Sequence, residues 1–245
     1  MEEKRMIEGR RPVLEALRAG TQITRILVQK GTHGEPVAEI ISLAAAGNVP
    51  VEYWEKSALE KRALTRNYQG VLAETPPFHY TPFEELISVK REEPLFLVIL
   101  DHIQDPHNLG ALIRTAYAAG CHGVVIPERR AVQMTPVAVR TAAGAAEYLP
   151  VAKVVNLARC VDACKAAGLW VYGADMDGEA LYTAGDYKGA TALVIGGEGE
   201  GISRLVKEKC DHIMRLPMKG EVASLNASVA GALIMYEVFR QRAGL

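Results

Sequence analysis

Hydrophobic and polar positions alternate along the first 75 residues in the manner of a small α/β unit. Runs rich in β-branched residues predict strands, and apolar residues at helical spacing between them predict helices. In chain order we expect a helix over 11–19, a strand over 23–28, a helix over 36–46, a strand over 51–54, a helix over 56–64 and a strand over 70–74. A unit of this length can bury a core of its own, so we predict a first domain over residues 1–75.

A proline-rich stretch then interrupts the pattern. Thr75–Pro82 contains three prolines in eight residues, which favours an extended segment over a helix or a central strand. A charged stretch with helical spacing, 83–91, ends before Pro94. We therefore predict a linker over residues 76–93.

Residues 94–245 show the alternation of longer strands and helices that is typical of a second α/β domain. The apolar run 95–100 is continuous, as expected of a strand buried on both faces. Further strands are predicted over 123–126, 148–151, 169–174, 191–195 and 212–216, and helices over 108–119, 136–143, 155–167, 203–209 and 225–242. This alternation predicts a mostly parallel sheet.

Charge and composition narrow the class of protein only a little. The 28 Lys and Arg residues are balanced by 29 Asp and Glu, so any nucleic-acid site must be a local basic patch. The four cysteines form no CxxC pair, and we expect no metal site. We find neither a run of the ~20 apolar residues that a membrane span needs nor the apolar core of a signal peptide. We therefore expect a cytoplasmic protein with reduced thiols and no membrane partner.

A glycine-rich loop, Ile195–Ile202, follows an apolar strand and precedes a helix. Glycines there allow close approach of a ligand to the backbone. The dinucleotide fingerprint fails because Ile202 stands where its third glycine is needed, and the P-loop fails because no Gly-Lys-Ser/Thr follows. Glu198 and Glu200 would repel a diphosphate, so the loop suits a ligand that lacks phosphates or carries positive charge. A tight turn with no ligand is the alternative.

Two other segments place polar residues beside strand ends, where open α/β sheets bind ligands. In the segment 101–116 we expect Asn108 to cap the following helix, with Arg114 further inside it. In the segment 216–228 we expect Ser224 to be the helix cap and Asn226 to lie in the first turn. Taken alone, each segment could be an ordinary helix start, and Arg114 an ordinary surface residue.

The order and the residue patterns of the three segments together resemble those of the SPOUT-class methyltransferases, specifically the TrmH family of RNA ribose 2′-O-methyltransferases. Asn-x-Gly-x-x-x-Arg-Thr-Ala spans Asn108–Ala116, Gly-x-Glu-Gly-x-Gly spans Gly196–Gly201, and Pro-Met-x-Gly-x-x-x-Ser-Leu-Asn-x-Ser spans Pro217–Ser228. With the preceding small domain, essentially all of the chain is similar to the bacterial subgroup that modifies a guanosine of large-subunit (23S) rRNA.

The resemblance implies a SPOUT-type parallel sheet with a C-terminal trefoil knot, S-adenosylmethionine as the cofactor, and a homodimer. It implies catalytic roles for Arg114, Asn108, Glu198 and Asn226. It implies cofactor contacts from Ile195, Gly196, Gly197, Gly199, Leu216, Pro217, Met218, Ser224 and Leu225. The family role of Arg114 is proton abstraction; because a guanidinium stays protonated in proteins, we favour a role as an anchor for a phosphate and for the developing alkoxide.

The first domain resembles the ribosomal-protein-like RNA-binding module of this subgroup. Its candidates for RNA contacts are Arg10, Arg11, Lys61, Arg62 and Arg66, for which a merely solvated charged face is the alternative. Two other functions stay open: methylation of a tRNA guanosine, and a non-enzymatic RNA-binding assembly factor of the same fold. A nicotinamide dehydrogenase is disfavoured by the failed fingerprint.

Overall fold

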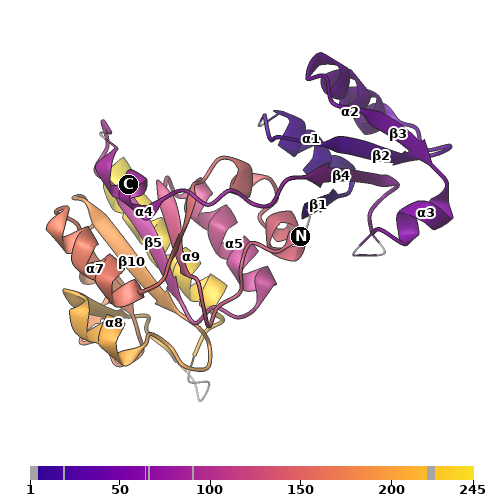
Figure 1. Ribbon diagram of the computed structural model, residues 1–245. Helices are drawn as coiled ribbons and strands as arrows, with labels where there is room; N and C mark the ends of the chain where they lie inside the picture. Colours follow the sequence, from indigo (N-terminus) through magenta and orange to yellow (C-terminus); the bar gives the residue numbers. More distant parts are fainter. Residues whose placement is uncertain (1–4, 19, 64, 66, 90, 220–223) are drawn as a thin grey trace. The chain divides into compact units, whose positions relative to one another are not determined.

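The computed structural model describes residues 5–18, 20–63, 65, 67–89, 91–219 and 224–245 (Figure 1). It divides into two compact units, which are described separately. The first contains the described residues of Met1–His79 together with Met134–Tyr148, and the second contains those of Tyr80–Gln133 and Leu149–Leu245. The segment 134–148 thus lies in the first unit, although the sequence predicted it to be part of the C-terminal domain.

The first unit is built on a four-stranded mixed sheet. Its strands are β1 (Arg5–Glu8), β2 (Arg25–Gln29), β3 (Val51–Trp54) and β4 (Val71–Thr75), in the order β1-β4-β2-β3. Only β2 and β3 run parallel, and β4 is antiparallel to both β1 and β2. The helical elements are α1 (Arg10–Arg18), α2 (Glu35–Ala46), α3 (Lys56–Glu60), α6 (Pro136–Thr141) and the short 3-10 helix η1 (Ala145–Glu147).

Alternation along β2 gives this sheet two buried faces. Ile26 and Val28 pack with residues of α1 and α2, whereas Leu27 points to the other face and packs with Leu59 of α3. Successive side chains along a strand point to opposite faces of the sheet. The apolar runs of β2 and β4 are therefore buried on both sides of a small sheet.

The second unit holds a seven-stranded sheet in which every recorded pairing is parallel. Its strands are β5 (Phe96–Asp101), β6 (Gly123–Pro127), β7 (Val151–Val154), β8 (Trp170–Ala174), β9 (Ala180–Leu181), β10 (Thr191–Gly196) and β11 (His212–Arg215). The order across the sheet is β7-β6-β5-β10-β8-β11-β9. The predicted α/β class with a parallel sheet is confirmed.

Helices cover both faces of this sheet, as Figure 1 shows. They are α4 (Phe83–Ser88), α5 (Pro106–Ala118), α7 (Leu157–Ala166), α8 (Arg204–Lys209) and α9 (Ala227–Ala243), with the 3-10 helix η2 (Tyr182–Ala184). Residues of α4, α7 and α8 share one core cluster with β-strand residues, and α5 packs against α9 on the other face. A Cβ atom at Gly231 of α9 would lie 2.5 Å from Leu112 of α5, so these two helices approach closely.

Because the strands are parallel, β5, β8, β10 and β11 end at the same edge of the sheet. The loops after β5 and β10 and before α9 are the three segments that the sequence singled out. The expected trefoil knot depends on the path of 217–226, and residues 220–223 lie outside the described residues. Across the described ranges, we find no helix that is both long and apolar enough to span a bilayer.

Candidate functional site

The three segments meet at the carboxylate of Glu198, which lies in the glycine-rich loop after β10. Its Oε1 accepts hydrogen bonds from Nδ2 of Asn108 at 3.1 Å and from the backbone N–H of Ala227 at 3.4 Å, and also from Nδ2 of Asn226. Asn226 Nδ2 lies 3.0 Å from Asn108 Oδ1 as well. Three of the four residues predicted to be catalytic are therefore brought into one hydrogen-bonded cluster.

Asn226 also forms the N-cap of α9, in place of the predicted Ser224. Its Oδ1 accepts from the backbone N–H of Ser228 at 3.0 Å and of Val229 at 3.4 Å. A single amide side chain thus satisfies the helix start with its oxygen and reaches Glu198 with its nitrogen. The cap prediction was wrong because Asn226 lies directly before α9 and bonds both the helix start and Glu198, whereas Ser224 lies further from the helix.

The cap of α5 differs from the prediction in the same way. Asp105 Oδ1 accepts from the backbone N–H of His107 at 3.0 Å, and Pro106 occupies the first helical position, which proline favours. Asn108 therefore lies inside the first turn and not at the cap. Its side chain is left to bond with Glu198.

Arg114, the fourth predicted catalytic residue, lies on α5 with its side chain exposed. Within the described part of the chain it makes no hydrogen bond and no ion pair. An exposed guanidinium without a carboxylate partner keeps all of its donors available to an incoming anion.

A cavity of about 300 Å³ lies beside this cluster at the carboxyl edge of the sheet. Eight of the nine predicted cofactor contacts line it: Ile195, Gly196, Gly197, Gly199, Leu216, Met218, Ser224 and Leu225. Pro217, the ninth, is not among the lining residues. The wall is largely apolar, as is usual for a small-molecule site.

The glycines of the loop allow backbone segments to approach one another closely. A Cβ atom at Gly197 would lie 2.2 Å from the carbonyl oxygen of His102, and one at Gly196 would lie 2.2 Å from the backbone of Gly201. No larger residue fits either position. Nothing lies within 4 Å of a Cβ at Gly199, so this third glycine leaves open space at the cavity.

The cavity has an acidic wall that the motifs did not reveal. Asp175, Met176 and Asp177 follow β8 and line the cavity together with Glu198 and Glu200. The signal that could have found them is their position after a strand that neighbours β10, at the same edge of the sheet. These carboxylates agree with the expectation of a ligand that carries positive charge.

Lys207 of α8 partly balances that wall. Its Nζ lies 2.9 Å from Asp175 Oδ1 and 3.3 Å from Asp177 Oδ2. The hydrogen bond to Asp175 raises the pKa of the Lys207 ammonium, against the opposing effect of burial. Glu198 and Glu200 have no lysine or arginine partner among the described residues.

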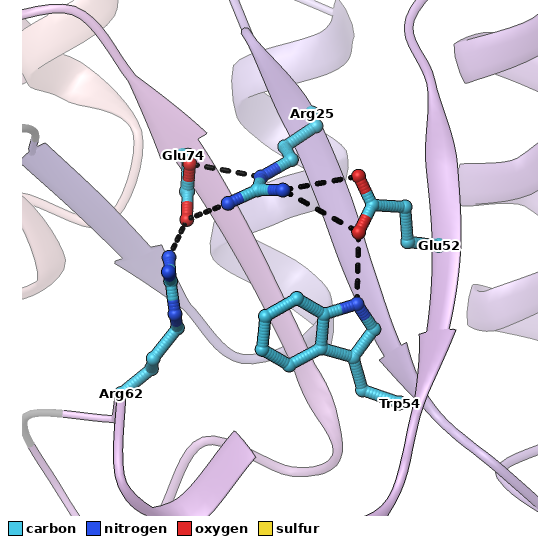
Figure 2. Close-up of polar contacts among 5 residues, drawn as sticks. All are labelled: Arg25, Glu52, Trp54, Arg62 and Glu74. Atoms are coloured by element: carbon cyan, nitrogen blue, oxygen red, sulfur yellow. Dashed lines mark hydrogen bonds and ion pairs between the residues drawn. The ribbon is translucent and has the colours of Figure 1, made fainter. Parts of the chain in front are cut away.

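In the first unit, the predicted RNA contact Arg62 lies in an ion-pair network. Figure 2 shows Arg62 directed at Glu74, whose buried carboxylate also accepts two bonds of 2.9 Å from Arg25. Arg25 pairs in addition with Glu52 at 3.1 Å, and the Trp54 indole N–H donates to Glu52 at 2.8 Å. That indole bond, followed by Arg25, lowers the pKa of Glu52. The two arginines and two glutamates of this network balance in charge.

The other predicted RNA contacts have different surroundings. Arg10 Nε donates to the carbonyl of Gln69 at 3.2 Å, whereas Arg11 and Lys61 are exposed. Arg66 lies outside the described residues. No set of three or more His, Cys, Asp or Glu residues is arranged to hold a metal ion in the described ranges.

Comparison with known families agrees with this architecture. The sequence model of the SpoU rRNA Methylase family matches residues 95–236, and that of the RNA 2′-O ribose methyltransferase substrate-binding domain matches residues 6–81. The chain belongs to the SpoU rRNA methylase family. The resemblance inferred from the three motifs is thereby confirmed, and the protein is an RNA methyltransferase with an N-terminal substrate-binding domain.

Individual relatives are similar over almost the whole chain. YacO of Bacillus subtilis, assigned to the TrmH family tRNA/rRNA methyltransferases, is 42% identical over 96% of this chain and 94% of its own. The SpoU methyltransferase AviRb of Streptomyces viridochromogenes has a TM-score of 0.83 at 26% identity, covering 98% of this chain and 90% of its own. An S-adenosylmethionine-bound rRNA methyltransferase of Sinorhizobium meliloti has the same TM-score and identity, covering 97% and 87%.

Proposed function

We propose that the protein transfers the methyl group of S-adenosylmethionine to a ribose 2′-hydroxyl of RNA, and that its target is a guanosine of large-subunit rRNA. The observation that carries the proposal is the meeting of Asn108, Glu198 and Asn226 beside an apolar cavity with an acidic wall. The cofactor-bound Sinorhizobium meliloti relative and the family of the N-terminal domain support it.

The cavity fits this cofactor by charge and by shape. S-adenosylmethionine has no phosphate and carries positive sulfonium and ammonium groups, which suits apolar walls bordered by Asp175, Glu198 and Glu200. The backbone around Gly196, Leu216 and Leu225 would hold the adenine, and Ile195 and Met218 would cover its faces. Pro217 would orient the strand end that carries these groups. When bound, the cofactor supplies an activated methyl group, so the protein mainly binds and orients.

Arg114 would act on the RNA and not on the cofactor. Its exposed guanidinium can bind the phosphate next to the target ribose and stabilise negative charge on the 2′-oxygen. Asn108 and Asn226, held by Glu198, fix the loops between which the ribose must enter. Positioning of this kind supplies much of the rate enhancement in reactions between two bound partners.

We infer that two copies of the chain form a homodimer through α9. Val229, Leu233 and Tyr236 of this helix are between 43% and 50% exposed and lie along one face. A contiguous exposed apolar face is typical of an interaction surface, and a second copy would cover it by symmetry. The trefoil knot belongs to the same proposal and is supported by the similarity to SpoU methyltransferase structures. A cytoplasmic location is proposed as well, because it follows from the proposed rRNA substrate.

Methyl transfer from labelled S-adenosylmethionine to ribosomal RNA and to tRNA tests the function directly. Ribose methylation mapped in cells with and without the gene then identifies the nucleotide. We expect one rRNA guanosine to lose its methyl group in cells lacking the gene. Loss at a tRNA guanosine would support the tRNA alternative, and cofactor binding without transfer to any RNA would support the assembly factor.

Arg114→Ala tests the residue roles. We expect methyl transfer to be lost while calorimetry still detects S-adenosylmethionine binding, because Arg114 does not line the cavity. Arg159→Ala, which removes an exposed arginine from α7, is the matched control and should retain activity. Loss of both transfer and cofactor binding in Arg114→Ala would contradict the assigned role.

A further inference from the structure

Two adjoining cavities open on the first unit around Arg10 and Gln69. The first, of about 520 Å³, is lined by Arg10, Gln29, Thr32, Gln69 and Gly70, and we call it the Arg10–Gln69 cavity. The second, of about 340 Å³, shares Arg10 and Gln69 with it and adds residues from the start of α1 and from α6. No residue of the ion-pair network in Figure 2 lines either one. The substrate-binding domain therefore has a concave surface apart from that network.

The backbone at residues 69 and 70 keeps the Arg10–Gln69 cavity open. Both residues have positive φ, 53° at Gln69 and 74° at Gly70. A Cβ atom at Gly70 would lie 2.7 Å from Thr32 Oγ1, so a side chain there would fill the space. A non-glycine residue with positive φ costs on the order of 1 kcal/mol and persists only where the surrounding structure imposes it.

Gln69 fixes the arginine at the cavity wall. Its Oε1 accepts from the backbone N–H of Arg10 at 3.2 Å, and its carbonyl oxygen accepts from Arg10 Nε at 3.2 Å. The guanidinium is therefore oriented before any ligand arrives. Such preorganisation lowers the entropic cost of binding.

The free polar groups of the cavity are mostly donors. The Tyr68 hydroxyl donates to Gln29 Oε1 at 3.3 Å, and Gln69 Oε1 is occupied by Arg10. The side-chain NH₂ groups of both glutamines make no hydrogen bond to any described residue. Together with Thr32, they offer hydrogen bonds to a ligand rich in acceptors.

The charge of this surface is also uncompensated. Glu8, the carboxylate in the second cavity, is buried and engaged by Thr65 and by Arg140, at 3.7 Å. Arg10 and Arg11 have no carboxylate partner among the described residues. The formal charge of the whole chain is -1, so Arg10, which lines both cavities, and Arg11, which lines the second, form a local basic site.

We propose that the Arg10–Gln69 cavity binds one unpaired nucleotide of the substrate RNA. Arg10 and Arg11 would hold its phosphate, and the amides of Gln29 and Gln69 would donate to acceptors on the edge of its base. A base must leave its helix to enter a concave site, so the cavity selects single-stranded loops or bulges over duplex. This inference rests on the proposed function, since it assigns the RNA-reading part of the same enzyme.

Gln29→Glu is the sharpest test. It is nearly isosteric and keeps the acceptor for Tyr68, but it replaces the free NH₂ donor with a charged oxygen. In the full-length protein, we expect about tenfold weaker binding of a labelled single-stranded oligoribonucleotide, and a smaller loss for the same sequence as a duplex. Binding within about twofold of wild type, or an equal loss for the duplex, would overturn the proposal.

Arg11→Gln provides a second test that does not depend on packing, since Arg11 is exposed. It should weaken binding of the single strand and reduce the salt dependence by about one unit of slope. Arg18→Gln, at the other end of α1, is the matched control and should bind as wild type. An effect of Arg11→Gln no larger than that of Arg18→Gln would also overturn the proposal.

Methyl transfer by the wild-type enzyme separates this site from the proposed function. If the wild type methylates RNA while Gln29→Glu and Arg11→Gln bind RNA normally, the site is wrong and the function stands. If both variants lose RNA binding but the wild type transfers no methyl group, the site stands and the function fails.

Discussion

At the residue scale, the candidate catalytic cluster depends on one oxygen atom of Glu198. That atom accepts N–H groups from Asn108, Asn226 and Ala227, which come from two helices on the same face of the sheet. A carboxylate that accepts several N–H groups orders them strongly, because charge-assisted hydrogen bonds are about twice as strong as neutral ones. Glu198 therefore positions the loops around the cavity.

Asn226→Asp tests that role without removing the cap of α9. The new carboxylate can still accept from Ser228 and Val229, but it repels Glu198 and loses the donor. We expect a melting temperature close to wild type and methyl transfer reduced at least about tenfold, measured with labelled S-adenosylmethionine.

Asn226→Ala is the companion variant. It removes the cap as well, so it should lower the free energy of unfolding by about 1 kcal/mol in chemical denaturation. Unchanged methyl transfer in Asn226→Asp would show that the cluster has no part in catalysis.

His122 gives the second unit an acid-sensitive contact. Its Nδ1 accepts from the backbone N–H of Phe96 at 3.0 Å, which only the neutral imidazole can do. Burial, followed by the charges of Arg91 and Arg242, lowers the pKa of His122. Because the pKa of this histidine is higher in the unfolded chain, about 6.5, the unfolded chain binds the proton first as the pH falls.

We therefore expect the melting temperature of the wild type to fall as the pH drops below about 6.5, and less so in His122→Asn. His33→Asn, which alters an exposed histidine, is the matched control. Parallel melting curves for wild type and His122→Asn across this range would refute the assignment.

At the element scale, the loop after β8 lies directly against β11. A Cβ atom at Gly178 would lie within 2.8 Å of three backbone atoms of residues 213–215, which cannot move without breaking the strand. We expect Gly178→Ala to lower the free energy of unfolding by about 1–3 kcal/mol and to weaken cofactor binding, since Asp175 and Asp177 precede it.

Gly189→Ala is the matched control. Nothing lies within 4 Å of a Cβ at that position, so denaturation and calorimetry should show little change. Equal effects of the two substitutions would mean that the close approach at Gly178 does not contribute to the free energy of unfolding or to cofactor binding.

Much of the element pattern could be predicted because burial imposes a period on the sequence. β5, β6 and β10 of the parallel sheet are nearly continuous apolar runs, and the helices that cover the sheet carry apolar stripes. β7 begins at Val151, three residues later than predicted, because Pro150 cannot donate in a sheet ladder. β1 was missed because its four residues, Arg5–Glu8, contain only two apolar side chains.

The site could be predicted where glycine and asparagine form a motif, but not where only geometry places a residue. Asp175 and Asp177 belong to no motif, and they reach the cavity because β8 lies next to β10. The pairing of Arg62 with Glu74 is equally invisible along the chain, since twelve positions separate them. Whether a charged side chain has a partner of opposite charge therefore depends on the folded structure and cannot be read from its neighbours in the sequence.

At the scale of the whole molecule, the proposed homodimer makes a prediction about α9. Leu233→Glu places a charge in the middle of the exposed apolar face and should convert a dimer into a monomer. Light scattering after size exclusion measures the mass directly. Leu205→Glu, on the exposed surface of α8, is the control and should remain dimeric. A monomeric wild type would contradict the proposal.

The hydrogen-bond donors of Glu198 lie far from it in the sequence, and this determines when the cluster can form during synthesis of the chain. A ribosome that synthesises this chain releases residue 108 early, residue 198 much later and residue 226 later still. The carboxylate cannot gather its donors until the segment that becomes α9 has emerged and docked. A chain interrupted by a premature stop codon before residue 226 would therefore lack the assembled cluster, however well its earlier parts fold. This RNA methyltransferase would therefore gain its activity only after the segment that becomes α9 has been made and has docked.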